Sequence, residues 1–142
     1  QLFEVIVVDD HSTDTTADVV RALQKQYSQL RLIQLADALQ GEVLNAYKKK
    51  AIAVAIEQSS NDYIVTTDAD CTVPPQWLQH FDAWLQQHNA VFVAAPVAYE
   101  HTGSVVSAFQ CLDFLSLQGI TAAAVSAGVH SMCNGANLMY SK

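Results

Sequence analysis

Short apolar runs alternate along the chain with longer stretches in which apolar residues recur at helical spacing. The run at residues 5–8 is apolar at consecutive positions, which is typical of a strand buried on both faces of a parallel sheet. Similar runs predict three further strands, at residues 31–35, 63–67 and 90–97. The helical spacing predicts helices at residues 15–26, at about 48–58, in a stretch whose first turn contains Pro75, and at 104 to about 127 with a break near Gly119. Residues 37–42 are predicted to be loop, and residues 133–140 to be mixed turn and strand.

Strands that alternate with helices predict an α/β fold with a mostly parallel sheet flanked by helices. The length of 142 residues fits a single domain over residues 1–142. The chain opens directly on an apolar run without an initiating Met and stops just after another apolar stretch. We therefore expect a fragment of a longer protein, truncated at both ends.

Composition excludes several classes of protein. With 51% hydrophobic and 15% charged residues, the chain is neither disordered nor collagen-like. Its net charge of −7 argues against a non-specific nucleic-acid binder, which needs the opposite sign. The three cysteines, Cys71, Cys111 and Cys133, are odd in number and widely spaced, which favours buried free thiols in a reducing compartment over disulfides or a zinc site.

No segment of the chain is expected to cross a membrane. The longest run without Asp, Glu, Lys or Arg covers residues 114–141, and its polar residues, among them Gln118 and Asn134, are costly in hydrocarbon. No signal peptide is visible at the start of the chain. Any membrane attachment is therefore expected outside residues 1–142.

Two acidic clusters follow predicted strands, Asp9-Asp10 and Asp68-Ala69-Asp70. Ligands of parallel α/β sheets bind beyond the carboxyl ends of the strands, so we expect both clusters on one rim of the sheet. In an extended chain, residues i and i+2 point the same way, so Asp68 and Asp70 could share one hard cation such as Mg²⁺ or Mn²⁺. The alternative is a solvated strand-to-helix turn in which an aspartate caps the helix.

Three other segments carry candidate binding groups. Asp10, at a strand end, can accept hydrogen bonds from a nucleotide base or ribose, whereas Ser12 or Asp14 is expected to cap the following helix. The run Lys48-Lys49-Lys50 opens a predicted helix and could bind a phosphate, although a solvated charge run is an equal alternative. The segment Asn134-Gly135-Ala136-Asn137 is, on its own, an ordinary turn. The five histidines show no metal-ligand spacing and are expected at the surface or in packing.

Taken in order, these segments resemble an inverting family 2 glycosyltransferase with the GT-A fold, a Rossmann-like fold for nucleotide-diphospho-sugar transferases. The matching stretches are Val7 to Thr16, Lys49-Lys50-Ala51, Thr67 to Cys71, and Asn134-Gly135-Ala136-Asn137. Each is modest alone, but the four in this order are specific. Similar sequences occur in bacterial processive and cell-envelope polysaccharide glycosyltransferases.

The resemblance implies a nucleotide-sugar donor, with a UDP-sugar favoured, a divalent Mg²⁺ or Mn²⁺ ion, and a carbohydrate or lipid-linked acceptor. Asp10 would contact the base, Asp68 would lie near the ribose and the metal, and Asp70 would be the direct metal ligand on the diphosphate. The remaining donor-site residues it implies are Lys49 or Lys50, and Asn134, Gly135 and Asn137 on the acceptor side of the donor sugar.

The chain departs from the family pattern at both ends. The family's first strand is expected before Gln1, and its acidic general base is expected beyond Lys142, so the catalytic base stays unknown and these residues alone are expected to be inactive. The resemblance also implies that the full-length enzyme acts at the cytoplasmic face of the inner membrane. It is compatible with a homo-oligomer.

Two rival interpretations remain at this stage. The pattern Asp68-x-Asp70-x-Thr72 also fits a Mg²⁺-dependent phosphohydrolase of the haloacid-dehalogenase type, with Asp68 as nucleophile and Asp70 as acid and base. That motif belongs near the start of a domain, which disfavours it here. The other rival is a non-catalytic nucleotide-binding module.

Overall fold

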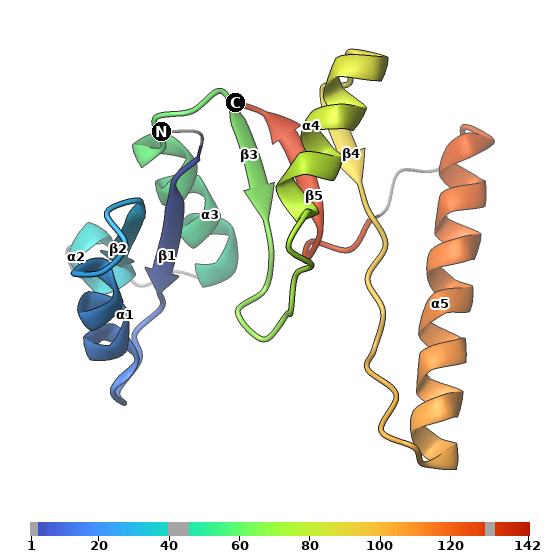
Figure 1. Cartoon of the computed structure of the whole chain (residues 1–142), viewed down its shortest axis with the longest axis horizontal. Coiled ribbons are helices and arrows are strands. Elements are labelled where there is room, and N and C mark those ends of the chain that lie inside the picture. Colours follow the sequence, from blue (N-terminus) through green and yellow to red (C-terminus); the bar gives the residue numbers. More distant parts are fainter. Residues whose placement is uncertain (1–2, 40–45, 130–132) are drawn as a thin grey trace. The chain divides into compact units, whose positions relative to one another are not determined.

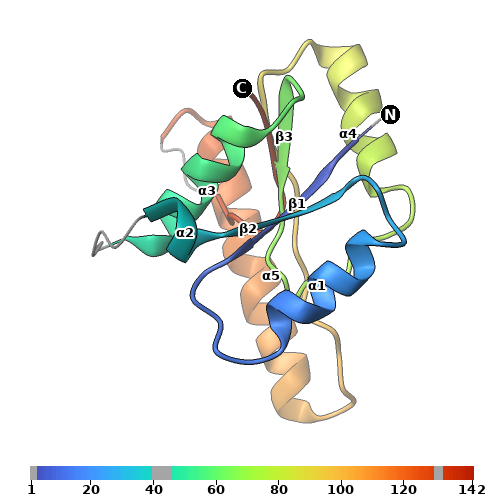
Figure 2. The ribbon, with the colours of Figure 1, turned by 90° about the vertical axis from the view of Figure 1, so that its left-hand side faces the viewer.

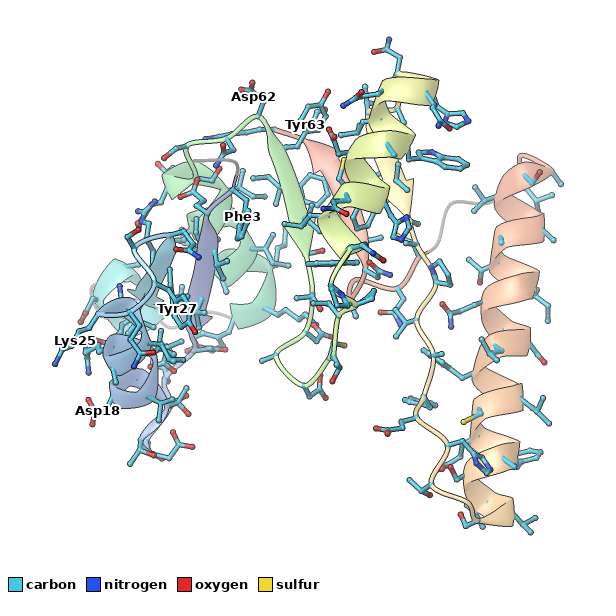
Figure 3. All side chains as sticks on the ribbon, in the orientation of Figure 1. Phe3, Asp18, Lys25, Tyr27, Asp62 and Tyr63 are labelled. Carbon is cyan, nitrogen blue, oxygen red and sulfur yellow. The ribbon has the colours of Figure 1, made fainter. Side chains whose placement is uncertain are left out.

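The protein is described here by a computed structural model covering residues 3–39, 46–129 and 133–142. It divides into two compact units, Gln1–Asp62 with Lys142, and Tyr63–Ser141. Asp62 and Tyr63, which flank the division, are labelled in Figure 3. The fold is mixed α/β with a parallel strand pair and helices, as predicted. The single domain over residues 1–142 stays a prediction.

The first unit is built on a parallel strand pair. Strand β1 (Val5–Asp9) pairs with β2 (Leu30–Gln34) in a register that runs from Val5 opposite Leu30 to Asp9 opposite Gln34. Helix α1 (Thr16–Gln24) connects the strands, α2 (Leu35–Leu39) follows β2 directly, and α3 (Tyr47–Gln58) packs against β1 (Figure 2). The buried core consists of Ile33, Leu35 and Val54, with Ile6, Val8, Tyr47 and Ala51 packed against them.

The predicted apolar stripe of α1 is only partly buried. Val20 is buried, but Val19 and Leu23 are exposed, and Tyr27 beyond the helix is 50% exposed (labelled in Figure 3). Helix α1 thus buries a narrower apolar face than the spacing of its apolar residues predicted.

The second unit is a three-stranded sheet in the order β3-β5-β4 (Figure 1). Strand β5 (Leu138–Ser141) runs antiparallel to both β3 (Tyr63–Thr66) and β4 (Phe92–Ala94), so β3 and β4 are parallel to each other. Thr66 and Ala94, at the carboxyl ends of their strands, both pair with Leu138 at the start of β5. One end of this sheet, which we call the Leu138 end, therefore collects the loops that leave β3 and β4 and the turn that enters β5.

Two helices complete the second unit. Helix α4 (Trp77–His88) buries Phe81, which contacts the Trp77 ring edge-on at 5.8 Å. Helix α5 (Val105–Ser126) begins at Ser104, whose hydroxyl accepts the Ser107 N–H. Residues 95–104, which precede α5, form an extended run that lies beside the helix and antiparallel to it (Figure 1). Successive contacts between the run and the helix are Val97 with Gln118, Tyr99 with Phe114 and Cys111, and Thr102 with Ser107.

Helix α5 has the length and composition of a membrane span, which the sequence analysis did not expect. Its apolar side chains are largely exposed, with Val105 at 88% and Phe109 at 69%. A crossing by α5, however, would carry the extended run with Glu100 and His101 through the hydrocarbon beside it. Lipid-exposed irregular backbone is not tolerated there, so this topology argues against a span.

Three local predictions are wrong. Pro75 lies in a turn before α4, in which the Trp77 N–H bonds to the Pro74 carbonyl, and α4 itself begins at Trp77. Helix α5 continues through Gly119, because the cost of one glycine, about 1 kcal/mol, does not outweigh the turns on either side. Residues 37–39 are helical because α2 starts at the fully buried Leu35, whereas residues 40–42 lie outside the described residues.

The three cysteines are free, as predicted. They are not buried, because Cys71 and Cys111 are half-exposed and Cys133 is exposed. Cys111 lies on α5 with its thiol against the Tyr99 carbonyl at 3.4 Å, and Cys71 follows β3 in a loop, so neither side chain belongs to an apolar core.

A carboxylate ties the elements of the first unit together. Glu4 accepts hydrogen bonds from the Ser60 N–H at 2.6 Å, from Asn61 Nδ2 at 3.0 Å and from Arg31 Nη1 at 3.1 Å. The residue before β1 is thereby joined to β2 and to the turn after α3. The hydrogen bond from Ser60, with smaller contributions from Arg31 and Asn61, lowers the pKa of Glu4 against the opposing effect of burial.

We predict that Glu4 stabilises the fold in a pH-dependent way. A carboxyl whose pKa is lowered on folding contributes stability above its unfolded pKa, close to 4.5, and that stability is lost as the pH falls through the folded pKa. Glu4→Gln should therefore lower the free energy of unfolding at neutral pH by about 1 kcal/mol, and by less in acid. Urea unfolding followed by circular dichroism at a series of pH values measures this.

The matched control is Glu57→Gln, which changes an exposed glutamate of α3 in the same unit. It should leave the free energy of unfolding unchanged across the series. A deficit for Glu4→Gln that stays constant as the pH falls well below 4.5 would contradict the assignment.

Candidate functional site

The loop after β1 begins with a buried carboxylate. Asp9 is 5% exposed and accepts the Ser12 N–H at 3.2 Å, which closes the turn. Asp14 accepts the N–H of Thr16, the first residue of α1, at 2.9 Å. The N-cap of α1 is Thr15, and not Ser12 or Asp14 as predicted. Hydrogen bonds from the side chain of Thr16 and, to a smaller extent, from its backbone N–H lower the pKa of Asp14. Asp9 and Asp14 therefore shape the loop, which leaves Asp10 as the exposed acid of this cluster.

Asp10 contacts the residue that follows it. The Nδ1 atom of His11 lies 2.8 Å from Asp10 Oδ1, and both side chains are about half exposed. The His11 ring also meets the Tyr47 ring edge-on, with centroids 5.3 Å apart. Because Tyr47 is the first residue of α3, this contact places the start of α3 beside the loop that carries Asp10.

The lysine run occupies the first turn of α3. Lys49 is exposed and Lys50 is half-buried. No acidic residue balances them in that turn, and Ala46 at the N-cap provides no side-chain hydrogen bond. Positive charge at a helix N-terminus opposes the helix dipole, so this run costs the helix stability. The first unit thus brings Asp10, His11 and the lysines to the same end.

The loop after β3 carries the second acidic cluster. Asp68 is half-buried and Asp70 is exposed. The Cys71 N–H bonds to the Asp68 carbonyl at 3.1 Å, so residues 68–71 form a turn. The prediction that Asp68 and Asp70 lie in extended chain is therefore wrong. Aspartate favours the first position of such turns, which explains why the strand ends here.

The Asn134–Asn137 segment forms the turn that enters β5. The Ala136 N–H bonds to Asn134 Oδ1 at 3.0 Å, and the Gly135 carbonyl accepts the Thr66 hydroxyl at 2.9 Å. Asn137 accepts Trp77 Nε1–H at 2.8 Å through its side-chain oxygen and donates through Nδ2 to the Pro96 carbonyl at 2.8 Å. These polar groups make an otherwise ordinary turn a fixed part of the Leu138 end.

These contacts hold the acidic loop at both of its ends. Thr66, just before the loop, bonds to Gly135, and Trp77, just after it, bonds to Asn137. The acidic loop and the Asn134–Asn137 turn therefore lie together at the Leu138 end. Sequence reasoning missed Thr66 and Trp77, whose only signals were a hydroxyl at a strand end and an indole at a helix start.

A divalent ion is compatible with the donor set of this loop. The described residues contain no group of three or more His, Cys, Asp or Glu side chains arranged around a metal position. Two carboxylates nevertheless suit Mg²⁺ or Mn²⁺, which commonly take one or two protein carboxylates and complete their shell with waters and phosphate oxygens. Asp68 and Asp70 fit such an ion only together with a phosphate ligand.

The two acidic clusters belong to different units, Asp10 to the first and Asp70 to the second. That both clusters lie on one rim of a single sheet stays a prediction. Within each unit, however, the predicted residues gather with partners of complementary chemistry. The first unit joins the Asp10 carboxylate to His11, whose ring contacts Tyr47 at the start of α3, and the second joins the acidic loop to an amide-rich turn.

The sequence was compared with known families and proteins. The family described as Glycosyl transferase family 2 matches residues 1–121. Glycosyltransferase AglE of Haloferax volcanii is 27% identical over 116 residues, which are 82% of this chain and 36% of that protein. Beta-monoglucosyldiacylglycerol synthase of Synechocystis sp. is 33% identical over 76 residues, 54% of this chain and 15% of that protein.

A third relative has the same extent of similarity. Undecaprenyl-phosphate 4-deoxy-4-formamido-L-arabinose transferase of Serratia proteamaculans is 33% identical over 76 residues, 54% of this chain and 22% of that protein. The chain thus spans 36% or less of the length of these relatives. No solved structure gives a significant match. Because the family match covers most of the sequence, the chain belongs to glycosyl transferase family 2.

Proposed function

We propose that the chain is the donor-binding part of an inverting glycosyltransferase that takes a nucleotide-diphospho-sugar, with UDP-sugar favoured. The observation that carries the proposal is the Leu138 end, where Thr66 and Trp77 fix the Asp68–Asp70 loop beside the Asn134–Asn137 turn. A carboxylate loop held rigidly against an amide-rich turn suits a ligand that combines phosphate, metal and sugar hydroxyls. The family match favours this transferase over the phosphohydrolase alternative.

The first unit supplies the groups for the nucleotide in this proposal. Asp10 accepts hydrogen bonds from the base, and Lys49 and Lys50 offer positive charge to the diphosphate. Their place in the first turn of α3 adds the positive end of the helix dipole, which favours an anion. A bound diphosphate would attract both these lysines and the positive end of the helix dipole, and so would offset the repulsion between them.

The second unit supplies the groups for the leaving group and the sugar. Asp70 and Asp68 hold a Mg²⁺ or Mn²⁺ ion that, when bound, offsets the negative charge developing on the diphosphate. Asn134 and Gly135 border the donor sugar. Both polar groups of the Asn137 side chain already bond to Trp77 and Pro96, so Asn137 holds the turn in position.

Transfer with inversion also needs a general base that removes the proton from the acceptor hydroxyl as it attacks the sugar. We assign this base to none of the described residues. The acceptor we propose is a carbohydrate or a lipid-linked molecule. Two relatives support the lipid class by name, one through diacylglycerol and one through undecaprenyl phosphate. Such an acceptor would place the enzyme at the cytoplasmic face of a membrane.

The proposal predicts that Asp70→Ala abolishes the Mn²⁺-dependent part of UDP binding while the fold is retained. The exposed carboxylate is the metal ligand in this scheme, and alanine removes it without disturbing a buried contact. Isothermal titration calorimetry with UDP, with and without Mn²⁺, measures the effect. Asp82→Ala, which changes an exposed aspartate of α4, is the control and should bind like the unmodified protein. Equal Mn²⁺-dependent binding by Asp70→Ala would contradict the metal assignment.

Asp10→Ala should weaken UDP binding by about 1–3 kcal/mol, the cost of losing one partner of a polar contact. The dependence of binding on Mn²⁺ should stay unchanged, because Asp10 contacts the base and not the ion. The same calorimetric titrations test this. Asp18→Ala on α1 serves as control, since Asp18 is an exposed aspartate of the same unit (labelled in Figure 3). Its side chain pairs with Arg21 at 2.9 Å. A change in Mn²⁺ dependence in Asp10→Ala would show that its role is misassigned.

Lys49→Gln should lower the affinity for UDP about fivefold, which corresponds to about 1 kcal/mol for one charge acting at 4 Å through water. The affinity for uridine, which lacks the diphosphate, should not change. Competition binding with the two ligands separates these effects. Lys25→Gln, which removes another exposed lysine of the first unit, should alter neither affinity. An equal loss for uridine and UDP would exclude a phosphate contact for Lys49.

A further inference from the structure

His11 has a backbone conformation that few residues adopt. Its φ of 60° lies in the left-handed region, which glycine enters freely and other residues enter at a cost. Among the described residues the other non-glycine case is Asn89, at the C-cap of α4, where a left-handed residue commonly ends a helix. No helix ends at His11. A strained conformation in a loop at a candidate site is a reason to ask what the side chain does there.

The side chain of His11 is held on two sides. Its Nδ1 lies 2.8 Å from Asp10 Oδ1, and because a carboxylate only accepts, the Nδ1 atom carries the shared proton. Its ring meets the Tyr47 ring at an interplanar angle of 83°, a favourable edge-to-face arrangement. Tyr47 itself packs against the buried core of the first unit. His11 thus connects an exposed carboxylate to the core through one hydrogen bond and one ring contact.

We propose that His11 is a positioning residue that orients the Asp10 carboxylate for the base of the nucleotide donor. This inference rests on the proposed function, in which Asp10 accepts hydrogen bonds from the base. A free aspartate side chain loses rotamer freedom when a ligand fixes it, and that loss weakens binding. By holding one carboxylate oxygen in the free protein, His11 removes part of this cost beforehand. Glycine would satisfy the backbone but would leave Asp10 unsupported.

The decisive variant is His11→Gly, because it keeps the left-handed backbone and removes only the ring. When His11→Gly is made in the otherwise unmodified protein, we expect the affinity for UDP to fall about fivefold, as for the loss of one hydrogen bond. Calorimetry with Mn²⁺ present measures this affinity. In a protein that carries Asp10→Asn we expect His11→Gly to have no further effect. This double-mutant cycle isolates the action of His11 through Asp10.

Asn89→Gly is the matched control, since it relieves the other left-handed residue and should leave UDP affinity unchanged. Thermal unfolding of each variant tests whether His11→Gly lowers the stability of the fold, and we expect an unchanged unfolding temperature. An equal loss of affinity in both backgrounds, or no loss in either, would overturn the inference while the proposed function stands. Failure of the unmodified protein to bind UDP, GDP, CDP or ADP would instead overturn the proposed function, and this inference with it.

Discussion

The second unit depends on the side chain of Asn137. Its amide bonds to the Trp77 indole and the Pro96 carbonyl, and its backbone carbonyl accepts the Ala95 N–H at 2.9 Å. One residue thereby joins the start of α4, the exit from β4 and the entry to β5. Together with the Thr66–Gly135 hydrogen bond, it closes both ends of the acidic loop. An aspartate pair on such a loop is presented by a rigid frame, which is the condition for binding a ligand in one geometry.

In the first unit, two local features lower the stability of the fold. The first turn of α3 carries lysines and no acidic residue, and His11 takes a left-handed backbone. Neither choice improves the fold, and each costs it something. Violations of local rules concentrate at functional sites. Both violations in this unit fall beside Asp10, the acid that neither caps α1 nor closes the loop after β1.

Three predicted strands agree with β1, β2 and β3 to within one residue at each end, because short apolar runs mark strands. The strand predicted at residues 90–97 is only the three-residue β4. Other features depend on contacts that periodicity does not encode. The direction of β5 follows from pairing between distant strands, with Leu138 opposite both Thr66 and Ala94. The turn at Asp68 is closed by a backbone hydrogen bond from Cys71, and every residue type except proline can donate such a bond. The φ of His11 likewise depends on its surroundings, since histidine enters the left-handed region more readily than most residues but usually has a negative φ.

The central claim is that a diphosphate and a divalent ion bind at the Leu138 end. Backbone amide NMR of the ¹⁵N-labelled protein, titrated with UDP and Mg²⁺ separately and together, tests it most directly. The account predicts that amides of residues 68–71 and 134–137 shift together, and that the full shift requires both ligands. Shifts confined to residues elsewhere in the second unit, or an unchanged spectrum for these two segments with both ligands present, would contradict it.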